Sequence, residues 1–404
     1  MKILQNPASK KVLLFSTLNP YPFWAGSENL WFDFVTDERV NKEIKFHVLL
    51  ADSPVTRKKA VELTKAGAKT NFYPHFNVSF ARRNLYRVRD TFTKRPHRTL
   101  PWYDAIRKGS YGLVWFNVAA LADLADLTYA AELCKKQGIP YLLLLQHGYE
   151  DFFLTNEKEI ATVTEVATSA KRFVFISKKN RRALERAIGQ RLNNAFHSMN
   201  AIPAAAIKKA AELSQTNSIS TEGTANFFNL GRFSPQDKAQ HLLLEAFSKD
   251  EWKERDWQLS FIGVAGFGQT YLEKLIHFYN IDPLRINILL HTDNVLEEIV
   301  KHDVLLMPSK AEGTPFAMIE SMACGRPALG TPVGGIPELI TDNETGWLCR
   351  STDSASIAEK LEEAWLQRTK WPELGAKAQK HIAQNYNQDT SFAELLRVLK
   401  EDIN

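Results

Sequence analysis

A loop and the helix expected after it, in the second half of the chain, carry the residues best placed for chemistry. The sequence there reads MPSKAEGTPFAMIESMACGRPALGTPVGGIPELI. An apolar strand should end at its start, with a loop over residues 309–314. Thr314 suits the N-cap and Pro315 the first helical position. The amides of Gly313, Thr314 and the first turn, which includes Phe316, would then be available to an anion.

Two carboxylates flank this expected helix start. Glu312 lies in the loop, and Glu320 lies six residues after the N-cap, about 9 Å along the helix axis. The neighbours of Glu320 on its helix face are small: Ala317, Ala323 and Cys324. A carboxylate on such a face is costly to bury unless it accepts hydrogen bonds. Two vicinal hydroxyls can supply them, as in a ribose or a hexose.

Two cations precede this region in the stretch NLGRFSPQDKAQHLLLEAF. The pattern predicts a strand, a loop and a helix, with Arg232 at the end of the strand and Lys238 near the start of the helix. A solvated surface lysine is the alternative for Lys238.

The stretch EGTPFAMIESMACGRPALGT, residues 312–331, resembles the E-x7-E donor motif of the family 4 retaining glycosyltransferases. The resemblance implies that Glu312 contacts the donor sugar, that Glu320 contacts the ribose, and that Arg232 and Lys238 bind the diphosphate. Fixed cations would stabilise the negative charge that develops on a nucleoside diphosphate leaving group. No DxD triad is evident, so the expected enzyme uses no metal and no other cofactor.

The resemblance extends to the first half of the chain. Ala25–Gly26 stands where the family usually has two glycines, and Gly26 would approach the diphosphate. His147, after an apolar strand, matches a family histidine that faces the donor sugar; a structural histidine is the alternative. Glu28 and Asp151 are candidates for acceptor binding, or equally for helix capping.

The chain alternates short apolar runs with amphipathic ones, the pattern of parallel, doubly wound α/β sheets. The family implies the GT-B fold, two Rossmann-like domains facing across a cleft. Strands are expected at Val12–Ser16, Phe46–Ala51, Gly112–Asn117, Ile139–Gln146, Arg172–Ser177, Asn226–Leu230, Gln258–Ile262, Arg285–Leu290, Asp303–Pro308 and Pro327–Gly330, and helices at Asn29–Asp37, Ala119–Gln137 and Lys178–Ile188.

Four regions follow from this alternation. Residues 1–200 should form the N-terminal, acceptor-binding domain, and residues 201–224, rich in Ala, Ser and Thr, the linker. Residues 225–385 should form the domain that binds the nucleotide sugar. Residues 386–404 should form a C-terminal helix that packs back toward the N-terminal domain.

Positive charge is concentrated in the first half of the chain. The net charge is +5 overall, made up of +13 for residues 1–195 and −8 for the remainder. It peaks in the segment 82–98, where a few aromatic residues are interspersed among the basic ones. A solvated basic helix and a patch that binds anionic lipid headgroups are the main alternatives. Nucleic acid is not an expected partner, because no nucleic-acid motif accompanies the patch.

The remaining composition favours the cytoplasm. The three cysteines show no CxxC spacing, no apolar run is long enough to cross a bilayer, and the N-terminus has no apolar signal region. The expected protein is cytoplasmic, either free or peripheral on the inner face of the membrane.

Together these features predict transfer of a hexose from a UDP- or GDP-sugar to a hydroxyl of a glycan or lipid-linked acceptor. Cell-surface polysaccharide or lipopolysaccharide synthesis is the expected setting. A nucleotide-sugar-binding protein without turnover and a sugar-nucleotide epimerase are the alternatives.

Overall fold

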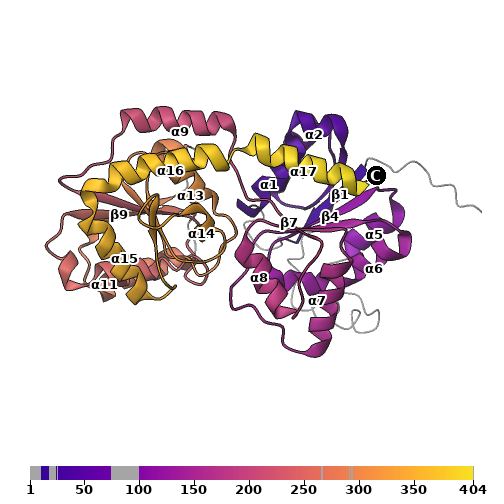
Figure 1. Cartoon of the computed structure of the whole chain (residues 1–404), viewed down its shortest axis with the longest axis horizontal. Coiled ribbons are helices and arrows are strands. Elements are labelled where there is room, and N and C mark those ends of the chain that lie inside the picture. The colour runs from indigo at the N-terminus through magenta and orange to yellow at the C-terminus, as the bar shows by residue number, and fades with distance from the viewer. Residues whose placement is uncertain are drawn as a thin grey trace, which may run out of the picture. The chain divides into compact units, whose positions relative to one another are not determined.

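The chain folds into two compact units, each an α/β sandwich (Figure 1). The computed structural model describes residues 11–17, 24, 26–73, 100–264, 267–290, 292 and 294–403. The first unit comprises the described residues up to Ser198 together with those from Phe392 onward, and the second comprises Met199–Ser391. The segment 82–98 and Ala25 lie outside the described residues.

The first unit is built on a parallel sheet with the order β3-β2-β1-β4-β5-β6-β7. Its strands are β1 (Lys11–Ser16), β2 (Lys45–Ala51), β3 (Lys69–Tyr73), β4 (Leu113–Val118), β5 (Tyr141–Leu145), β6 (Arg172–Phe175) and β7 (Ala195–His197). Its helices are α1 (Gly26–Thr36), α2 (Glu38–Glu43), α3 (Pro54–Lys65), α5 (Leu100–Lys108), η2 (Leu121–Leu127), α6 (Thr128–Gln137), α7 (Glu157–Ser169), α8 (Lys178–Ala187) and most of α17 (Gln388–Ile403).

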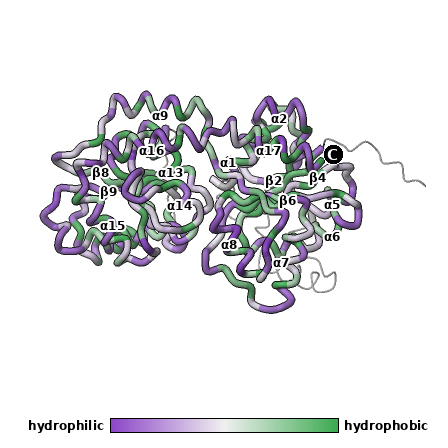
Figure 2. Tube along the Cα trace, in the orientation of Figure 1, coloured by the Kyte–Doolittle hydropathy of each residue, from purple (hydrophilic) through white to green (hydrophobic). Residues whose placement is uncertain are grey.

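Both faces of this sheet are buried, as alternating residues of β1 show. Leu13 and Phe15 pack into a core with α5 to α8, whereas Val12 and Leu14 pack with α1, α2, α3 and α17. Such two-sided burial explains the near-continuous apolar strands, which Figure 2 shows as mostly hydrophobic.

The second unit repeats the plan with the order β10-β9-β8-β11-β12-β13, again all parallel. Its strands are β8 (Ala225–Leu230), β9 (Trp257–Gly263), β10 (Ile286–Leu290), β11 (Val304–Met307), β12 (Ala328–Gly330) and β13 (Gly346–Leu348). Its helices are α9 (Ala204–Thr216), α10 (His241–Phe247), η3 (Asp250–Trp252), α11 (Phe267–Phe278), η4 (Pro283–Arg285), α12 (Val295–Ile299), α13 (Phe316–Ala323), α14 (Ile336–Leu339), α15 (Ser354–Leu366), η5 (Arg368–Lys370) and α16 (Trp371–Asn385).

In each sheet the strand order reverses once, between β1 and β4 and between β8 and β11. The segments that follow the two strands at such a point run to opposite faces of the sheet, and open α/β sheets bind their ligands there. The fold therefore predicts a site just after β8 and β11.

The structure differs from the sequence predictions at two helices. Residues 204–216, within the expected linker, form α9, whose Ala210 is buried against the second core. Strong helix formers such as Ala, Lys and Glu account for it without a marked apolar stripe. The expected helix 119–137 is divided into η2 and α6, because Leu121, Leu124 and Leu127 recur every three residues, the period of a 3₁₀-helix.

Candidate active site

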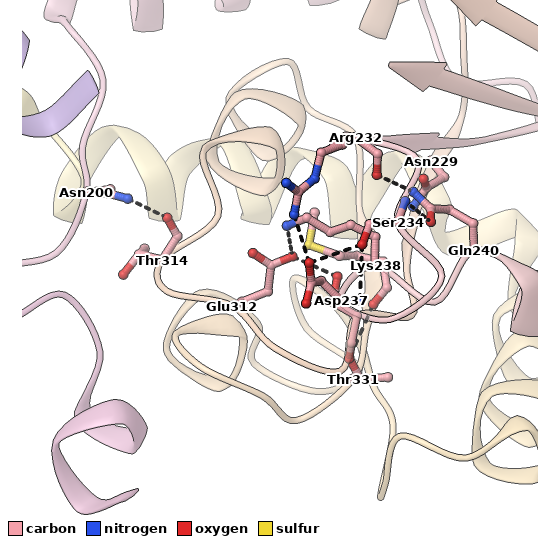
Figure 3. A network of polar contacts seen from close by, with 12 residues as sticks. Asn200, Asn229, Arg232, Ser234, Asp237, Lys238, Gln240, Glu312, Thr314 and Thr331 are labelled. Carbon is pink, nitrogen blue, oxygen red and sulfur yellow. Dashed lines mark hydrogen bonds and ion pairs between the residues drawn. The ribbon is translucent and has the colours of Figure 1, made fainter. Parts of the chain in front are cut away.

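The candidate site of the second unit lies where β8 and β11 end. Asn229 on β8 donates through Nδ2 to the Leu306 carbonyl of β11 over 2.7 Å, which joins the two strands just before they end. Arg232 follows β8, and residues 309–314 follow β11. Figure 3 shows the side chains of Arg232, Lys238 and Glu312 close to one another. The sheet therefore brings together side chains that are about 75 residues apart in sequence.

Lys238 and Glu312 form an ion pair between these two loops. Lys238 Nζ lies 2.6 Å from Glu312 Oε1, and Ser309 Oγ donates to the same oxygen over 2.7 Å. Glu312 is only 4% exposed, whereas one quarter of the Lys238 side chain is exposed. The Lys238 side chain is thus paired with Glu312 and still partly exposed to solvent.

Arg232 is held in a similar way but is more exposed. Its Nη2 donates to Asp237 Oδ2 over 2.8 Å, and half of its side chain is exposed. Ser234 Oγ also donates to Asp237 Oδ2, over 3.1 Å. The Asp237 carbonyl in turn accepts from the Lys310 amide over 2.7 Å, so Asp237 links the β8 loop to the β11 loop.

A tight turn supports the loop that carries Glu312. Thr331 Oγ1 donates to the Ser309 carbonyl over 2.5 Å, and the Gly335 amide donates to the Gly313 carbonyl over 2.6 Å. Gly334 has φ +53°, and a Cβ there would lie 2.3 Å from the Glu312 carbonyl oxygen. The two glycines are therefore required by close backbone packing.

The helix start is one residue later than the sequence predicts. Pro315, not Thr314, is the N-cap of α13, because the Pro315 carbonyl accepts from the Met318 and Ile319 amides. Thr314 lies just outside the helix, and its carbonyl accepts from Asn200 Nδ2 over 2.7 Å.

Two first-turn amides, those of Phe316 and Ala317, have no intrahelical acceptor at such a position. They share this end of the sheet with the two cation-bearing loops. Gly313, Thr314 and Pro315 are buried beside them. The predicted helix start is therefore present at this end of the sheet, beginning at Phe316, and its use as an anion site stays a prediction.

Glu320 has different surroundings from Glu312. It is half-buried in the second turn of α13, and no hydrogen bond or ion pair joins its carboxylate to the rest of the described chain. Burial raises its pKa to about 7. A carboxylate in this state gains from any ligand that offers hydroxyl donors.

The first unit holds the other predicted residues. Gly26 begins α1 and is exposed, His147 is half-buried two residues after β5, and Asp151 is exposed in the following turn. Glu28 is 3% exposed and accepts hydrogen bonds from three side chains. An acceptor contact by Glu28 would displace one of these, so the structure favours an internal role for it.

Three side chains that the sequence pattern did not indicate complete the site of the second unit: Asp237, Ser309 and Asn200. The only local signal was the position of Asp237 between two cations. Within the described ranges, no group of three His, Cys, Asp or Glu side chains is arranged to hold a metal ion. In the same part of the chain, no helix has the length and apolarity needed to cross a membrane.

Comparison with known proteins finds a family match within the second unit. Residues 211–385 match the model of the family described as "Glycosyl transferases group 1". The chain is 28% identical over 166 residues to N-acetyl-alpha-D-glucosaminyl L-malate synthase of Bacillus anthracis. The matched stretch makes up 40% of this chain and 43% of the relative. The chain thus spans about half the length, or less, of curated relatives such as this one.

Two further similarities cover more of the chain. The chain is 22% identical to the GDP-mannose-dependent monoacylated alpha-(1-6)-phosphatidylinositol monomannoside mannosyltransferase of Corynebacterium glutamicum, over 74% of this chain and 79% of the relative. The crystal structure of Anabaena Alr3699/HepE in complex with UDP superposes with a TM-score of 0.70 at 17% identity, covering 97% of this chain and 100% of the other. At that identity the superposition establishes the fold.

Proposed function

Through residues 211–385 the chain belongs to the glycosyl transferases group 1 family and has the GT-B fold, and on this premise we propose that it is a retaining glycosyltransferase. The proposed reaction moves a hexose from a UDP- or GDP-sugar to a hydroxyl of a glycan or glycolipid acceptor. Cell-surface polysaccharide or lipopolysaccharide synthesis is the proposed setting. The GDP-mannose dependence of the Corynebacterium relative and the UDP bound to the Anabaena protein support a nucleotide-sugar donor.

The observation that carries the proposal is the convergence of Arg232, Lys238, Glu312 and the start of α13 at one switch point. Lys238 has three N–H donors, of which Glu312 takes one, so two can bind phosphate oxygens. The Arg232 guanidinium bonds to Asp237 through Nη2 alone, which leaves its other donors available. A charge-assisted hydrogen bond contributes about 1.5–3 kcal/mol.

In this proposal two cations that are already in position stabilise the negative charge that develops on the departing diphosphate. The ion pairs with Glu312 and Asp237 hold both cations before the donor arrives, so little reorganisation is needed at the moment of reaction. The departing phosphate oxygen deprotonates the incoming hydroxyl on the same face, which gives retention of configuration without a protein nucleophile. With two cations and a helix start at the diphosphate, we propose that no metal is required.

Glu320 and Glu312 take the hydroxyl groups of the donor. Glu320, which has no partner among the described residues, would accept from the ribose hydroxyls. Glu312, fixed by Lys238 and Ser309, would lie beside the hexose. Gly26 and His147 of the first unit remain proposed donor contacts, and Asp151 a proposed acceptor contact. The anionic membrane surface proposed for the segment 82–98 also remains a proposal.

The test begins with thermal shifts of the whole protein in UDP, GDP and their hexose conjugates. The stabilising donor is then assayed for hydrolysis and for transfer to a panel of glycan and lipid-linked acceptors, with and without EDTA. We expect transfer with retained anomeric configuration and equal rates in EDTA. Donor binding without any turnover would instead indicate a nucleotide-sugar-binding protein, and a changed sugar without an acceptor would indicate an epimerase.

Glu312→Gln is the matching active-site variant. It keeps the size of the side chain but weakens the contact with Lys238, and we expect turnover to fall at least tenfold with the fold intact. Lys274→Ala, on the exposed face of α11, is the control and should keep the wild-type rate. Wild-type turnover in Glu312→Gln would remove Glu312 from the proposed mechanism.

A further inference from the structure

The first unit contains a buried row of polar side chains where its own strand order reverses. Glu28 Oε1 accepts from Ser16 Oγ over 3.0 Å and from Asn117 Nδ2 over 3.1 Å, and Glu28 Oε2 accepts from Trp31 Nε1 over 2.8 Å. Ser16 ends β1, and Asn117 lies near the end of β4. All four side chains are at least 91% buried. Polar side chains buried this deeply do not contribute to solubility, so another role has to account for them.

The row continues to the residue that precedes His147. Gln146 Nε2 donates to Asn117 Oδ1 over 2.8 Å, and the Gln146 amide donates to the Val118 carbonyl over 2.9 Å. Gln146 is 3% exposed, and its Oε1 is buried without a hydrogen-bond partner. Both the main chain and the side chain of Gln146 are therefore tied to β4.

Hydrogen-bond chemistry fixes the direction of the row. An ionised carboxylate only accepts, so Asn117 must turn its NH₂ group toward Glu28. The Asn117 oxygen then faces Gln146, which must offer its own NH₂ group. Gln146 Oε1 is consequently left at the far end of the row. The orientation of both amides thus depends on the charge of one carboxylate.

We propose that Glu28, Asn117 and Gln146 are positioning residues that hold the turn after β5, and with it His147, in one arrangement. The proposal rests on the proposed function, which places His147 at the donor sugar. His147 packs edge-on against the ring of Tyr149, with centroids 5.6 Å apart, so a shift of the turn moves both rings. Glu28 acts through Gln146 and does not touch the donor.

Protonation of Glu28 would remove the charge that fixes the orientation of the Asn117 and Gln146 amides. Burial raises the pKa of Glu28 to about 7, against hydrogen bonds from Trp31, Ser16 and Asn117 that lower it. Across from these, burial and the nearby Glu28 charge raise the pKa of Tyr73 on β3, so Tyr73 stays neutral. No cation pairs with Glu28 within the described part of the chain. Above pH 7 the row is ordered as described, and below it Glu28 can donate to Ser16 and release Asn117.

Two variants of the whole protein test the positioning role. Glu28→Gln removes the charge, and Trp31→Phe removes one donor while leaving the contacts of Glu28 Oε1 in place. We expect Glu28→Gln to raise hydrogen exchange at the amides of residues 146–148 about tenfold and to lower kcat for UDP-glucose or GDP-mannose hydrolysis about tenfold. The affinity for UDP or GDP should change less than twofold. Trp31→Phe should lower Tm but leave exchange at 146–148 and kcat near wild type.

The pH profile separates positioning from stability. Wild-type kcat should fall as the pH drops through about 7, and in Glu28→Gln this limb should be absent. Gln146→Met, which keeps the side-chain volume and the fold, should reproduce the loss in kcat if Glu28→Gln fails to fold. Wild-type exchange at 146–148 in both Glu28→Gln and Gln146→Met would overturn the proposal. If the wild-type protein shows no turnover with any donor, the proposed function fails, and the exchange measurement still decides the positioning role.

Discussion

The carboxylates of Glu312, Glu28 and Glu320 differ in the hydrogen-bond donors that surround them. Glu312 and Glu28 are both almost fully buried, and each accepts from several donors of the protein itself. Glu320 is half-buried and has none among the described residues. Burial raises the pKa of both Glu28 and Glu320 to about 7. A ligand is therefore needed to complete the surroundings of Glu320, whereas those of Glu28 are complete.

Nucleotide affinity should depend on pH through Glu320. Ribose hydroxyls bind the ionised carboxylate best, so binding should lower the pKa of Glu320 and release a proton. Affinity for the preferred nucleotide should then rise by up to about tenfold between pH 6 and pH 8. Calorimetry across this range measures it. Glu320→Gln should bind more weakly and with no such slope, and an unchanged slope in this variant would place the titration elsewhere.

Folding stability should show the opposite trend for the same group. A carboxyl whose pKa is raised in the folded state stabilises the fold below its unfolded pKa, and this contribution is lost as the pH rises to about 7. Between about pH 4.5 and 7, wild type should therefore lose stability relative to Glu320→Gln. Urea unfolding of both proteins at several pH values measures this difference, and parallel curves would contradict it.

The Lys238 ammonium should matter for the donor more than for the fold. Lys238→Ala removes two potential phosphate contacts and leaves Glu312 bonded to Ser309. We expect nucleotide-sugar turnover to fall at least about 10- to 100-fold, because each lost contact contributes about 1.5–3 kcal/mol. Near-normal rates and donor affinity would exclude Lys238 from the site. Lys274→Ala is again the suitable control.

At the scale of elements, the β11 loop depends on the glycine turn beneath it. Gly334→Ala would place a Cβ 2.3 Å from the Glu312 carbonyl oxygen, at φ +53°. Gly138 has a similar φ of +67°, but a Cβ there meets nothing within 4 Å. We expect Gly138→Ala to cost about 1 kcal/mol and Gly334→Ala clearly more, with loss of nucleotide binding. Thermal unfolding and UDP titration compare the two, and equal losses would contradict the packing argument.

The sequence predicts elements well where burial is strong. All ten predicted strands form, with ends shifted by only a few residues, and nine of them are mostly buried. β10 is the exception, because its Leu289 and Leu290 are exposed. Three strands were not predicted: β3, β7 and β13. β3 and β7 are only partly buried, and β7 and β13 have three residues each, too few for a pattern.

The site was predictable only in part, because its contacts join residues that are far apart in the sequence. Glu312, Glu320, Arg232 and Lys238 stand out by type and spacing. The ion pair between Lys238 and Glu312 joins residues 74 positions apart and follows from strand order, which local patterns do not encode. The sequence pattern predicts the N-cap one residue early, at Thr314, because capping preference favours Thr over Pro, whereas the hydrogen bonds make Pro315 the N-cap.

At the scale of the whole molecule, the second unit is an insertion within the first. The chain enters it after Ser198 and leaves it before Phe392. Entry and exit are neighbours, since the Ile202 amide donates to the Tyr386 carbonyl and the Gln388 amide donates to the Ile202 carbonyl, each over 3.1 Å. A unit with adjacent ends and its own core can fold by itself.

A fragment of residues 199–391 should therefore fold and bind nucleotide alone. It contains Arg232, Lys238, Glu312 and Glu320 with all their described partners. We expect cooperative thermal unfolding and an affinity for UDP or GDP within about tenfold of the whole protein, without sugar transfer. Circular dichroism and calorimetry test both points. A fragment that folds but binds no nucleotide would contradict the placement of the donor in this unit.

The position of α17 also sets the order in which a newly made chain can fold. Phe392, Leu395, Leu399 and Ile403 cover the same face of the first sheet as α1 and α2, and the Asp402 carboxylate pairs with Arg172. On the ribosome, residues 11–198 emerge first, but this face is covered only when the last helix is released. The unit synthesised second can thus be finished first, and the earlier half waits with apolar surface exposed, a state in which chaperones bind nascent chains.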